Sequence, residues 1–213
     1  MRLFLVFLTA IFIVMSCNSD YTSRKKGYFH IPLPTHSYQV FNKPGFPYSF
    51  EYPVYAAIVK DSTYFDDNPE SPYWINVDFS QFGARVFLSY KKIGGNALYK
   101  VKQVNGNYKD SLATNRFDKM VNDAFNLTNK NESVASFIKD SLFHTNNGIT
   151  GIMFKVGGNA ATASQFFLSD TTANFIRGAL YFDTTPNADS LKPVQDFLQA
   201  DINHLINSFR WNN

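Results

Sequence analysis

Alternation of apolar and polar residues is the feature that most constrains the fold of this 213-residue chain. Successive side chains of a β-strand point to opposite faces of the sheet, so alternation predicts a strand with one buried face. Residues 73–79 place four large side chains on one face: Tyr73, Ile75, Val77 and Phe79. After a turn at residues 81–83 the same pattern returns in Ala84, Val86, Leu88 and Tyr90. We therefore expect two neighbouring strands that cover a core.

Further strands are predicted on both sides of this pair. Residues 46–53 are bounded by prolines, which favours an edge strand, and we expect residues 54–59 to continue it. Later strands are predicted at about residues 136–143, 149–156, 164–168 and 174–182. Asn146-Asn147-Gly148 predicts a hairpin because these residues tolerate positive φ, and Asp170-Thr171-Thr172 predicts a second turn.

Two segments have helical periodicity instead. In residues 111–127, apolar side chains recur every three or four positions, and Asp110 or Ser111 can cap the start. A terminal helix is capped by Asp189 or Ser190 and carries Pro193 in its first turn. Its apolar stripe consists of Leu191, Val194, Leu198, Ile202, Leu205 and Phe209, joined by Phe197 and Ile206. The element order predicts an α+β domain, a mainly antiparallel sheet flanked by helices.

The N-terminus has the pattern of a secretory signal. Arg2 precedes an apolar run over residues 3–15, which as a helix would span about 20 Å, too short for the roughly 30 Å core of a bilayer. Ser16 and Cys17 follow, and this junction resembles the lipobox of bacterial lipoproteins, in which the cysteine thiol receives the lipid. The alternative is an ordinary signal peptide followed by a free cysteine. The lipobox resemblance favours Cys17 as the lipid attachment site.

These features divide the chain into three parts. Residues 1–16 are the expected lipoprotein signal peptide, 17–45 a lipidated N-terminus with a proline-rich tether, and 46–213 a single α+β domain. The lipid would hold the domain on a membrane of the cell envelope, in the periplasm or at the cell surface. Asn18, directly after the cysteine, favours the outer membrane.

Several functional classes receive no support from the composition. Removing residues 1–16 takes away one of 20 basic residues and none of the 17 acidic ones, which leaves 19 − 17 = +2, too little for a nucleic-acid reader. Lipidation of Cys17, the only cysteine, would exclude disulfides and thiol catalysis. The glycine pairs lack the partners of phosphate-binding loops. We expect neither an enzyme nor a cofactor.

Metal binding is also not expected. The four histidines do not stand at metal-ligand spacing: His30, His36, His144 and His204. His204 is expected to be partly buried and hydrogen-bonded within the terminal helix. An acidic group could coordinate calcium, but it lacks EF-hand spacing and is better explained as a solvated loop: Asp61, Asp66, Asp67 and Glu70.

Short stretches across the chain carry a more specific signal. They are residues 50–53, 74–76, 88–90, 157–158, 165–170, 180–182, 186–191 and 204–211. Together with Cys17, they resemble the gliding-motility lipoprotein GldD family. The resemblance implies a non-enzymatic lipoprotein that is needed for surface gliding and is linked to the type IX secretion machinery. The Phe-x-Tyr-Pro at 50–53 and the Ser-Phe at 208–209 also resemble the PsbP/Mog1-like α/β/α sandwich.

Three functional hypotheses follow. The first is a membrane-tethered scaffold of the motility and secretion machinery, with residues 21–33 or 65–74 as its contact surface. The second is a membrane-tethered protein that binds a small molecule or glycan in an aromatic groove, for which a pocket with convergent polar groups is the expected sign. The third is a hydrolase, which requires paired titratable groups in a cleft.

Overall fold

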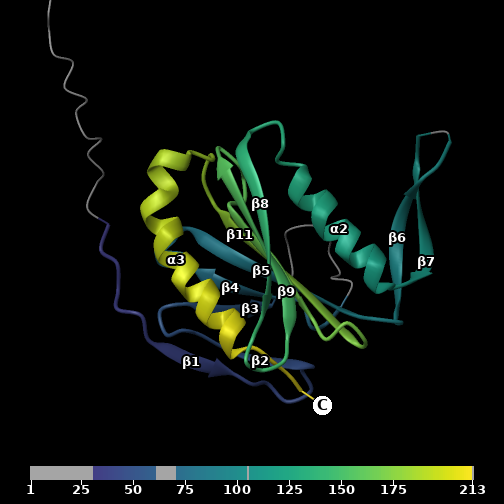
Figure 1. Cartoon of the computed structure of the whole chain (residues 1–213), viewed down its shortest axis with the longest axis horizontal. Coiled ribbons are helices and arrows are strands. Elements are labelled where there is room, and N and C mark those ends of the chain that lie inside the picture. The colour runs from purple at the N-terminus through teal and green to yellow at the C-terminus, as the bar shows by residue number, and fades with distance from the viewer. Residues whose placement is uncertain (1–30, 61–70, 105, 213) are drawn as a thin grey trace, which may run out of the picture. The chain divides into compact units, whose positions relative to one another are not determined.

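Seven antiparallel strands form the central sheet of the protein (Figure 1). The computed structural model describes residues 31–60, 71–104 and 106–212, and residues 33–213 form one compact unit. The strand order is β3 (Ala57–Lys60), β4 (Ile75–Phe79), β5 (Ala84–Lys92), β11 (Asn174–Phe182), β10 (Ser164–Ser169), β9 (Thr150–Gly158) and β8 (Ala135–His144). All six pairings are antiparallel.

The alternation seen in the sequence directs side chains as expected. In β5 the four residues of the predicted inner face are buried: Ala84, Val86, Leu88 and Tyr90. In β4, Ile75, Val77 and Phe79 are buried and Tyr73 before the strand is partly exposed. Asn76, expected on the outer face, is also buried, because both faces of this sheet are covered.

One helix covers each face of the sheet. Thr128 of α2 (Phe117–Asn129) contacts Gln165, whereas Gln199 of α3 (Ala188–Ser208) accepts a hydrogen bond from Ser164. Ser164 and Gln165 are consecutive in β10 and point to opposite faces, so the two helices lie on opposite sides. The predicted fold class, α+β with a mainly antiparallel sheet between helices, is confirmed.

Large apolar residues of α2 and the sheet form the core on the first face. Met120 and Ala124 pack with three buried rings from successive strands: Phe154, Phe167 and Phe175. Rings of Phe167 and Phe175 stack with their centroids 5.1 Å apart. This packing fixes α2 against β9, β10 and β11.

A second, three-stranded sheet lies beside α3. Its order is β1 (Tyr38–Phe41), β2 (Tyr48–Pro53) and β12 (Arg210–Trp211). The prediction that residues 46–53 form an edge strand was wrong, because β1 pairs with residues 50–53 and β12 with residues 48–49. Pro47 precedes β2 and Pro53 ends it, so neither proline interrupts the strand. Residues 54–56 turn the chain, and β3 joins the larger sheet rather than continuing β2.

The folded unit begins earlier than the expected boundary at residue 46. Residues 33–45 belong to the compact unit, and β1 lies within the segment that we expected to be tether. Phe41 is buried there and stacks on Phe50. Proline before β1 therefore does not prevent the chain from joining the fold. The expected signal peptide and residues 17–30 lie outside the described residues.

The start of α2 also differs from the prediction. Residues 111–114 belong to β7 (Tyr108–Thr114), which forms a hairpin with β6 (Asn96–Lys102), and the helix begins at Phe117. Arg116, not Asp110 or Ser111, is the N-cap. The base of the hairpin is held by Asn115, whose amide nitrogen donates to Gly95 O and whose carbonyl accepts from Gly94 N.

The terminal helix is confirmed, with a shifted start. Asn187 is its N-cap, because the Asn187 side chain accepts a hydrogen bond from Ser190 N at 3.0 Å. Pro193 consequently lies beyond the first turn, inside the helix. Buried side chains of the predicted stripe include Val194, Leu198, Ile202, Leu205 and Phe209, whereas Leu191 and Phe197 are partly exposed. Among the described helices, none is long and apolar enough to cross a membrane.

Both predicted turns are confirmed by their backbone geometry. Gly148 has a φ of 76° between β8 and β9. Thr171, between β10 and β11, has a φ of 66°, and it is the non-glycine residue with positive φ in the described part of the chain. Asp170 holds this turn, since its Oδ1 accepts hydrogen bonds from the amides of Thr172, Ala173 and Asn174 at 3.0, 2.8 and 2.8 Å.

Three glycines of the large sheet lie beneath phenylalanine rings of the neighbouring strand. The cross-strand pairs are Gly151 with Phe143, Gly157 with Phe137, and Gly178 with Phe166. A Cβ atom at any of the three would lie within 2.5 Å of the partner ring. These positions need glycine because each ring occupies the volume of the missing side chain.

Candidate functional site

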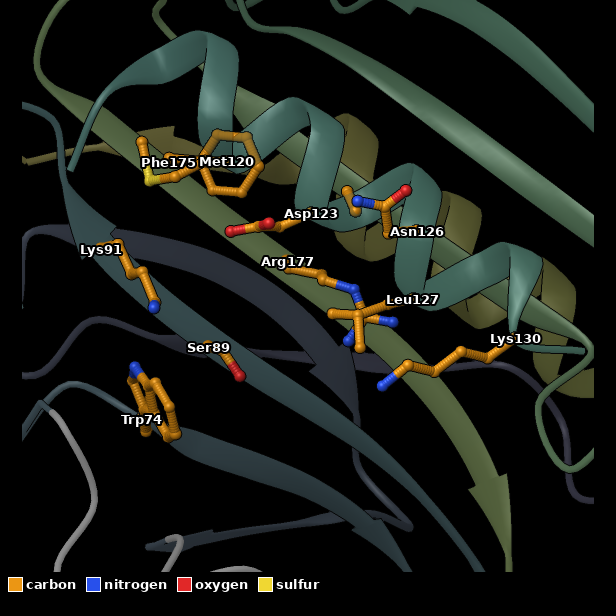
Figure 2. Close-up of a pocket in the computed structure, with 11 residues that line it drawn as sticks. Trp74, Ser89, Lys91, Met120, Asp123, Asn126, Leu127, Lys130, Phe175 and Arg177 are labelled. Atoms are coloured by element: carbon orange, nitrogen blue, oxygen red, sulfur yellow. The ribbon is translucent and has the colours of Figure 1, made fainter. Parts of the chain in front are cut away.

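A pocket of about 380 Å³ lies between α2 and strands β5 and β11, and Figure 2 shows side chains from these elements pointing toward one another across it. This volume lies within the range of small-molecule sites. Its lining residues are Trp74, Ser89, Lys91, Met120, Asp123, Ala124, Asn126, Leu127, Lys130, Phe175 and Arg177.

The inner part of the pocket is apolar. Met120 and Ala124 of α2 and Phe175 of β11 belong to the core and form its floor. Trp74, just before β4, forms a side wall, and its indole Nε1 donates a hydrogen bond of 2.8 Å to Tyr90 O. Because this bond fixes the indole, the pocket has a rigid aromatic wall rather than a mobile one.

Arg177 brings a positive charge to the pocket from β11. Its Nη2 donates to Oε1 of the buried Gln165, which also accepts from Thr128 Oγ1 at 3.4 Å. Burial lowers the pKa of the Arg177 guanidinium, and the neighbouring Tyr181 opposes that effect. Within the described residues, no carboxylate lies at ion-pair distance from this guanidinium, and Gln165 Nε2 has no hydrogen-bond partner.

Three further charged residues line the same pocket. Lys91 comes from β5, whereas Asp123 and Lys130 come from α2 and its C-cap. With Arg177, three cations face one carboxylate, a formal excess of 3 − 1 = +2. Lys130 is exposed and Asp123 is partly exposed, and the four charged side chains of the described lining together carry a net positive charge.

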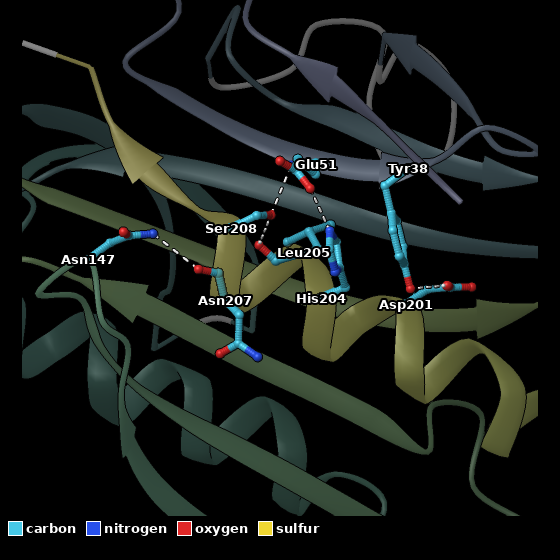
Figure 3. A network of polar contacts seen from close by, with 8 residues as sticks. All are labelled: Tyr38, Glu51, Asn147, Asp201, His204, Leu205, Asn207 and Ser208. Carbon is cyan, nitrogen blue, oxygen red and sulfur yellow. Dashed lines mark hydrogen bonds and ion pairs between the residues drawn. The ribbon is translucent and has the colours of Figure 1, made fainter. Parts of the chain in front are cut away.

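A second polar cluster lies where α3 meets the first strand of the unit (Figure 3). Asp201 of α3 is 1 % exposed and accepts hydrogen bonds from Tyr38 Oη at 3.1 Å and Tyr55 Oη at 2.5 Å. Its Oδ1 also lies 2.7 Å from His36 Nδ1. Burial raises the pKa of Tyr38 to about 12, and the charge and hydrogen bond of Asp201 act in the same direction.

The aromatic ring of Tyr38 links this cluster to a second pair. It stacks on His204, with ring centroids 3.5 Å apart and an interplanar angle of 6°. His204 Nε2 lies 2.6 Å from Glu51 Oε2, and Glu51 N donates to Ser208 Oγ at 2.9 Å. These side chains hydrogen-bond to or stack on one another, which indicates that the cluster holds β1 and β2 against α3.

The structure places the residues singled out in the sequence as follows. Cys17, His30 and the acidic group at residues 61–70 lie outside the described residues. His204 is partly buried and hydrogen-bonded, as predicted. His144 contacts Thr150 Oγ1 at 2.9 Å. No group of three or more His, Cys, Asp or Glu side chains in the described ranges could hold a metal ion.

Sequence reasoning missed the pocket because its charged residues come from separate elements. Lys91, Asp123 and Arg177 are far apart in the sequence, and only the packing of α2 brings them together. One local signal existed: Arg177 is the single charged residue of the mainly apolar strand Asn174–Phe182. Trp74 also lines the pocket, at the end of the segment 65–74 that we expected to be a contact surface.

The fold and the pocket define the class of protein as an α/β/α domain with a ligand-sized pocket between α2 and the sheet, whose described lining carries a net positive charge. The model of the gliding motility lipoprotein GldD family matches residues 18–211, and the chain belongs to this family. It is accordingly a membrane-anchored lipoprotein of the cell envelope that is associated with gliding motility.

No curated protein matches the sequence. Among solved structures, the fold is similar to the solution structure of cyanobacterial PsbP (CyanoP) from Synechocystis sp. PCC 6803, with 11 % sequence identity and a TM-score of 0.45. The similarity covers 84 % of this chain and 95 % of that one.

Proposed function

We propose that the protein is a non-enzymatic scaffold or accessory factor of the gliding-motility and type IX secretion machinery, held at the outer membrane by lipid on Cys17. The observation that carries this proposal is the family match over residues 18–211. The lipobox-like junction at Ser16–Cys17 and the asparagine at position 18 support the anchor and the membrane.

Strand β8 offers a surface for a protein partner. It is an edge of the seven-stranded sheet and is 10 residues long, and no strand of the described residues pairs with its outer side, so its outer backbone groups can pair with a strand of another protein. Leu142 of β8 is 65 % exposed, and Phe137 is also exposed. An exposed edge that carries large apolar side chains is typical of a site of protein–protein contact.

Gene deletion with complementation tests this function. We expect the deletion strain to lose colony spreading and adhesin export, and the wild-type gene to restore both. Cys17→Ser should not restore them, since the domain would lose its anchor. Leu142→Lys should restore them poorly, whereas Val59→Lys, an exposed residue on the opposite edge strand β3, is the matched control and should restore them fully. Immunoblots must show equal amounts of each variant.

A deletion strain that spreads and exports adhesins like the wild type would exclude a role in this machinery. Full rescue by Leu142→Lys would exclude the β8 edge as the contact surface while leaving the cellular role intact.

A second candidate function is the binding of a small molecule by the membrane-tethered domain. The pocket beneath α2 favours it, because an aromatic wall and several polar groups converge on a cavity of ligand size. Binding and scaffolding are compatible, since the pocket and the β8 edge are formed by different residues.

A further inference from the structure

The pocket beneath α2 contains a cation that no carboxylate of the described residues neutralises. The Arg177 guanidinium is half-buried, and its polar partners in the described part of the chain, Gln165 and Tyr181, are uncharged. A buried charge is costly unless it is paired with an opposite charge. A ligand that brought a negative charge to Arg177 would remove this cost.

The surroundings of Arg177 strengthen the same preference. Lys130 carries a second positive charge at the pocket opening, and no carboxylate within the described residues lies at ion-pair distance from its ammonium group. Asp123 is the one acidic residue of the lining, and it is outnumbered. The pocket therefore attracts anions and repels cations.

The apolar part of the pocket defines the rest of the ligand. Trp74 is fixed by its hydrogen bond to Tyr90, and Phe175 and Met120 form an apolar floor. An inorganic ion would leave these surfaces in contact with water. A ligand with an apolar or aromatic body would cover them and gain from their burial.

We infer that the pocket binds a small organic anion, whose carboxylate or phosphate group pairs with Arg177 and Lys130 and whose apolar body lies against Trp74 and α2. This inference rests on the second candidate function and specifies its ligand class. It does not depend on the scaffold role.

Calorimetric titration of the full chain in a non-ionic detergent tests the inference. The probes are phenyl phosphate, phenylacetate and the neutral analogue benzyl alcohol. We expect both anions to bind at least tenfold more tightly than the alcohol, because only they can pair with the guanidinium. Raising the salt concentration should weaken the binding of both anions and leave the affinity for benzyl alcohol unchanged.

Four variants assign the binding to named charges. Arg177→Gln should lower the affinity for phenyl phosphate about tenfold, and Lys130→Gln should lower it about fivefold, since charge-assisted hydrogen bonds are lost. Asp123→Asn should raise the affinity for phenyl phosphate roughly threefold, because it removes the negative charge of the described lining, which repels an anion. Lys109→Gln, an exposed lysine of β7 outside the pocket, is the matched control and should leave the affinity unchanged. Because Lys130 is exposed, its variant should fold even if Arg177→Gln does not.

Each outcome decides a separate point. Equal binding of benzyl alcohol and the anions would overturn the anion preference while preserving small-molecule binding. Absence of binding by all three probes would overturn both. Binding only to vesicles that contain phosphatidylglycerol, with neither soluble anion bound, would overturn the inference in favour of a lipid head group. Anion binding that Lys130→Gln and Asp123→Asn leave unchanged would place the site elsewhere.

Discussion

Nδ1 of His36 lies 2.7 Å from Oδ1 of Asp201, although 165 residues separate the two in the sequence. The Asp201 carboxylate also accepts hydrogen bonds from Tyr38 and Tyr55, and the ring of His36 stacks on Phe197 with centroids 4.3 Å apart. One buried carboxylate of α3 thus contacts His36 before β1, Tyr38 in β1 and Tyr55 in the turn after β2. The N-terminal end of the folded unit is fixed at this point.

Removal of Asp201 should loosen that attachment. We expect Asp201→Ala to lower the free energy of unfolding by about 3 kcal/mol, because three donors lose a buried acceptor. Urea denaturation measures this change. Limited proteolysis should also cut the chain near β1 sooner than in the wild type.

Asp196→Ala is the matched control for this variant. Asp196 lies on the same helix, but it is exposed and pairs with the exposed Lys192, so its loss should cost less than about 0.5 kcal/mol. Similar losses for the two variants would show that the buried carboxylate has no special role in holding β1.

The ring of Phe166 occupies the space beside Gly178. A Cβ atom at Gly178 would lie 2.2 Å from Cζ of this fully buried ring, so Gly178→Ala should destabilise the protein by about 2 kcal/mol through overpacking. Chemical denaturation checks the value. The double variant Gly178→Ala/Phe166→Leu should recover part of the loss, and a double variant that is less stable by the sum of the single effects would contradict this explanation.

Asp170 should make stability depend on acidity. Its burial alone raises the carboxyl pKa, but hydrogen bonds from the Ala173, Asn174 and Thr172 amides outweigh that effect, so the pKa of Asp170 is lowered. The ionised carboxylate then stabilises the fold above about pH 4, and this contribution is lost as pH falls through the lower folded value. At pH 7 we expect Asp170→Asn to reduce the Tm by about 3 °C.

The pH profile separates this charge effect from simple loss of packing. The difference in Tm between wild type and Asp170→Asn should shrink steadily from pH 4 to pH 2. A difference that stays constant over this range would mean that the negative charge does not stabilise the turn.

Strands and helices with a buried face could be predicted from the sequence because burial leaves a pattern. The alternation in Ala84–Tyr90 and the stripe from Val194 to Phe209 correspond to β5 and α3. The turns at Gly148 and Thr171 were recognisable from residues that tolerate positive φ.

Elements without a buried face left no such pattern. Every described side chain of β7 except Ala113 is exposed, and Leu112 is 67 % exposed, so its spacing from later apolar residues was mistaken for helix periodicity. β1 has only one buried residue, Phe41, and its main polar contact is with Asp201 far along the chain.

The pocket could not be predicted for a related reason. Its charges come from β5, α2 and β11, and no short segment contains two strands and the helix that covers them. Arg177 alone signalled it, as a charged residue in a buried strand, but such a residue is also compatible with a purely structural role. Only the position of α2 over the sheet shows that Lys130 and Asp123 line the same pocket as Arg177.

Crosslinking in living cells tests the central claim most directly. A tagged wild-type chain and its Cys17→Ser variant are crosslinked, captured and compared by quantitative mass spectrometry with an untagged strain. We predict that gliding-motility and type IX secretion proteins are enriched with the wild type and depleted with the variant. Capture of the wild-type chain with none of these proteins enriched over the untagged strain would contradict a scaffold role in this machinery.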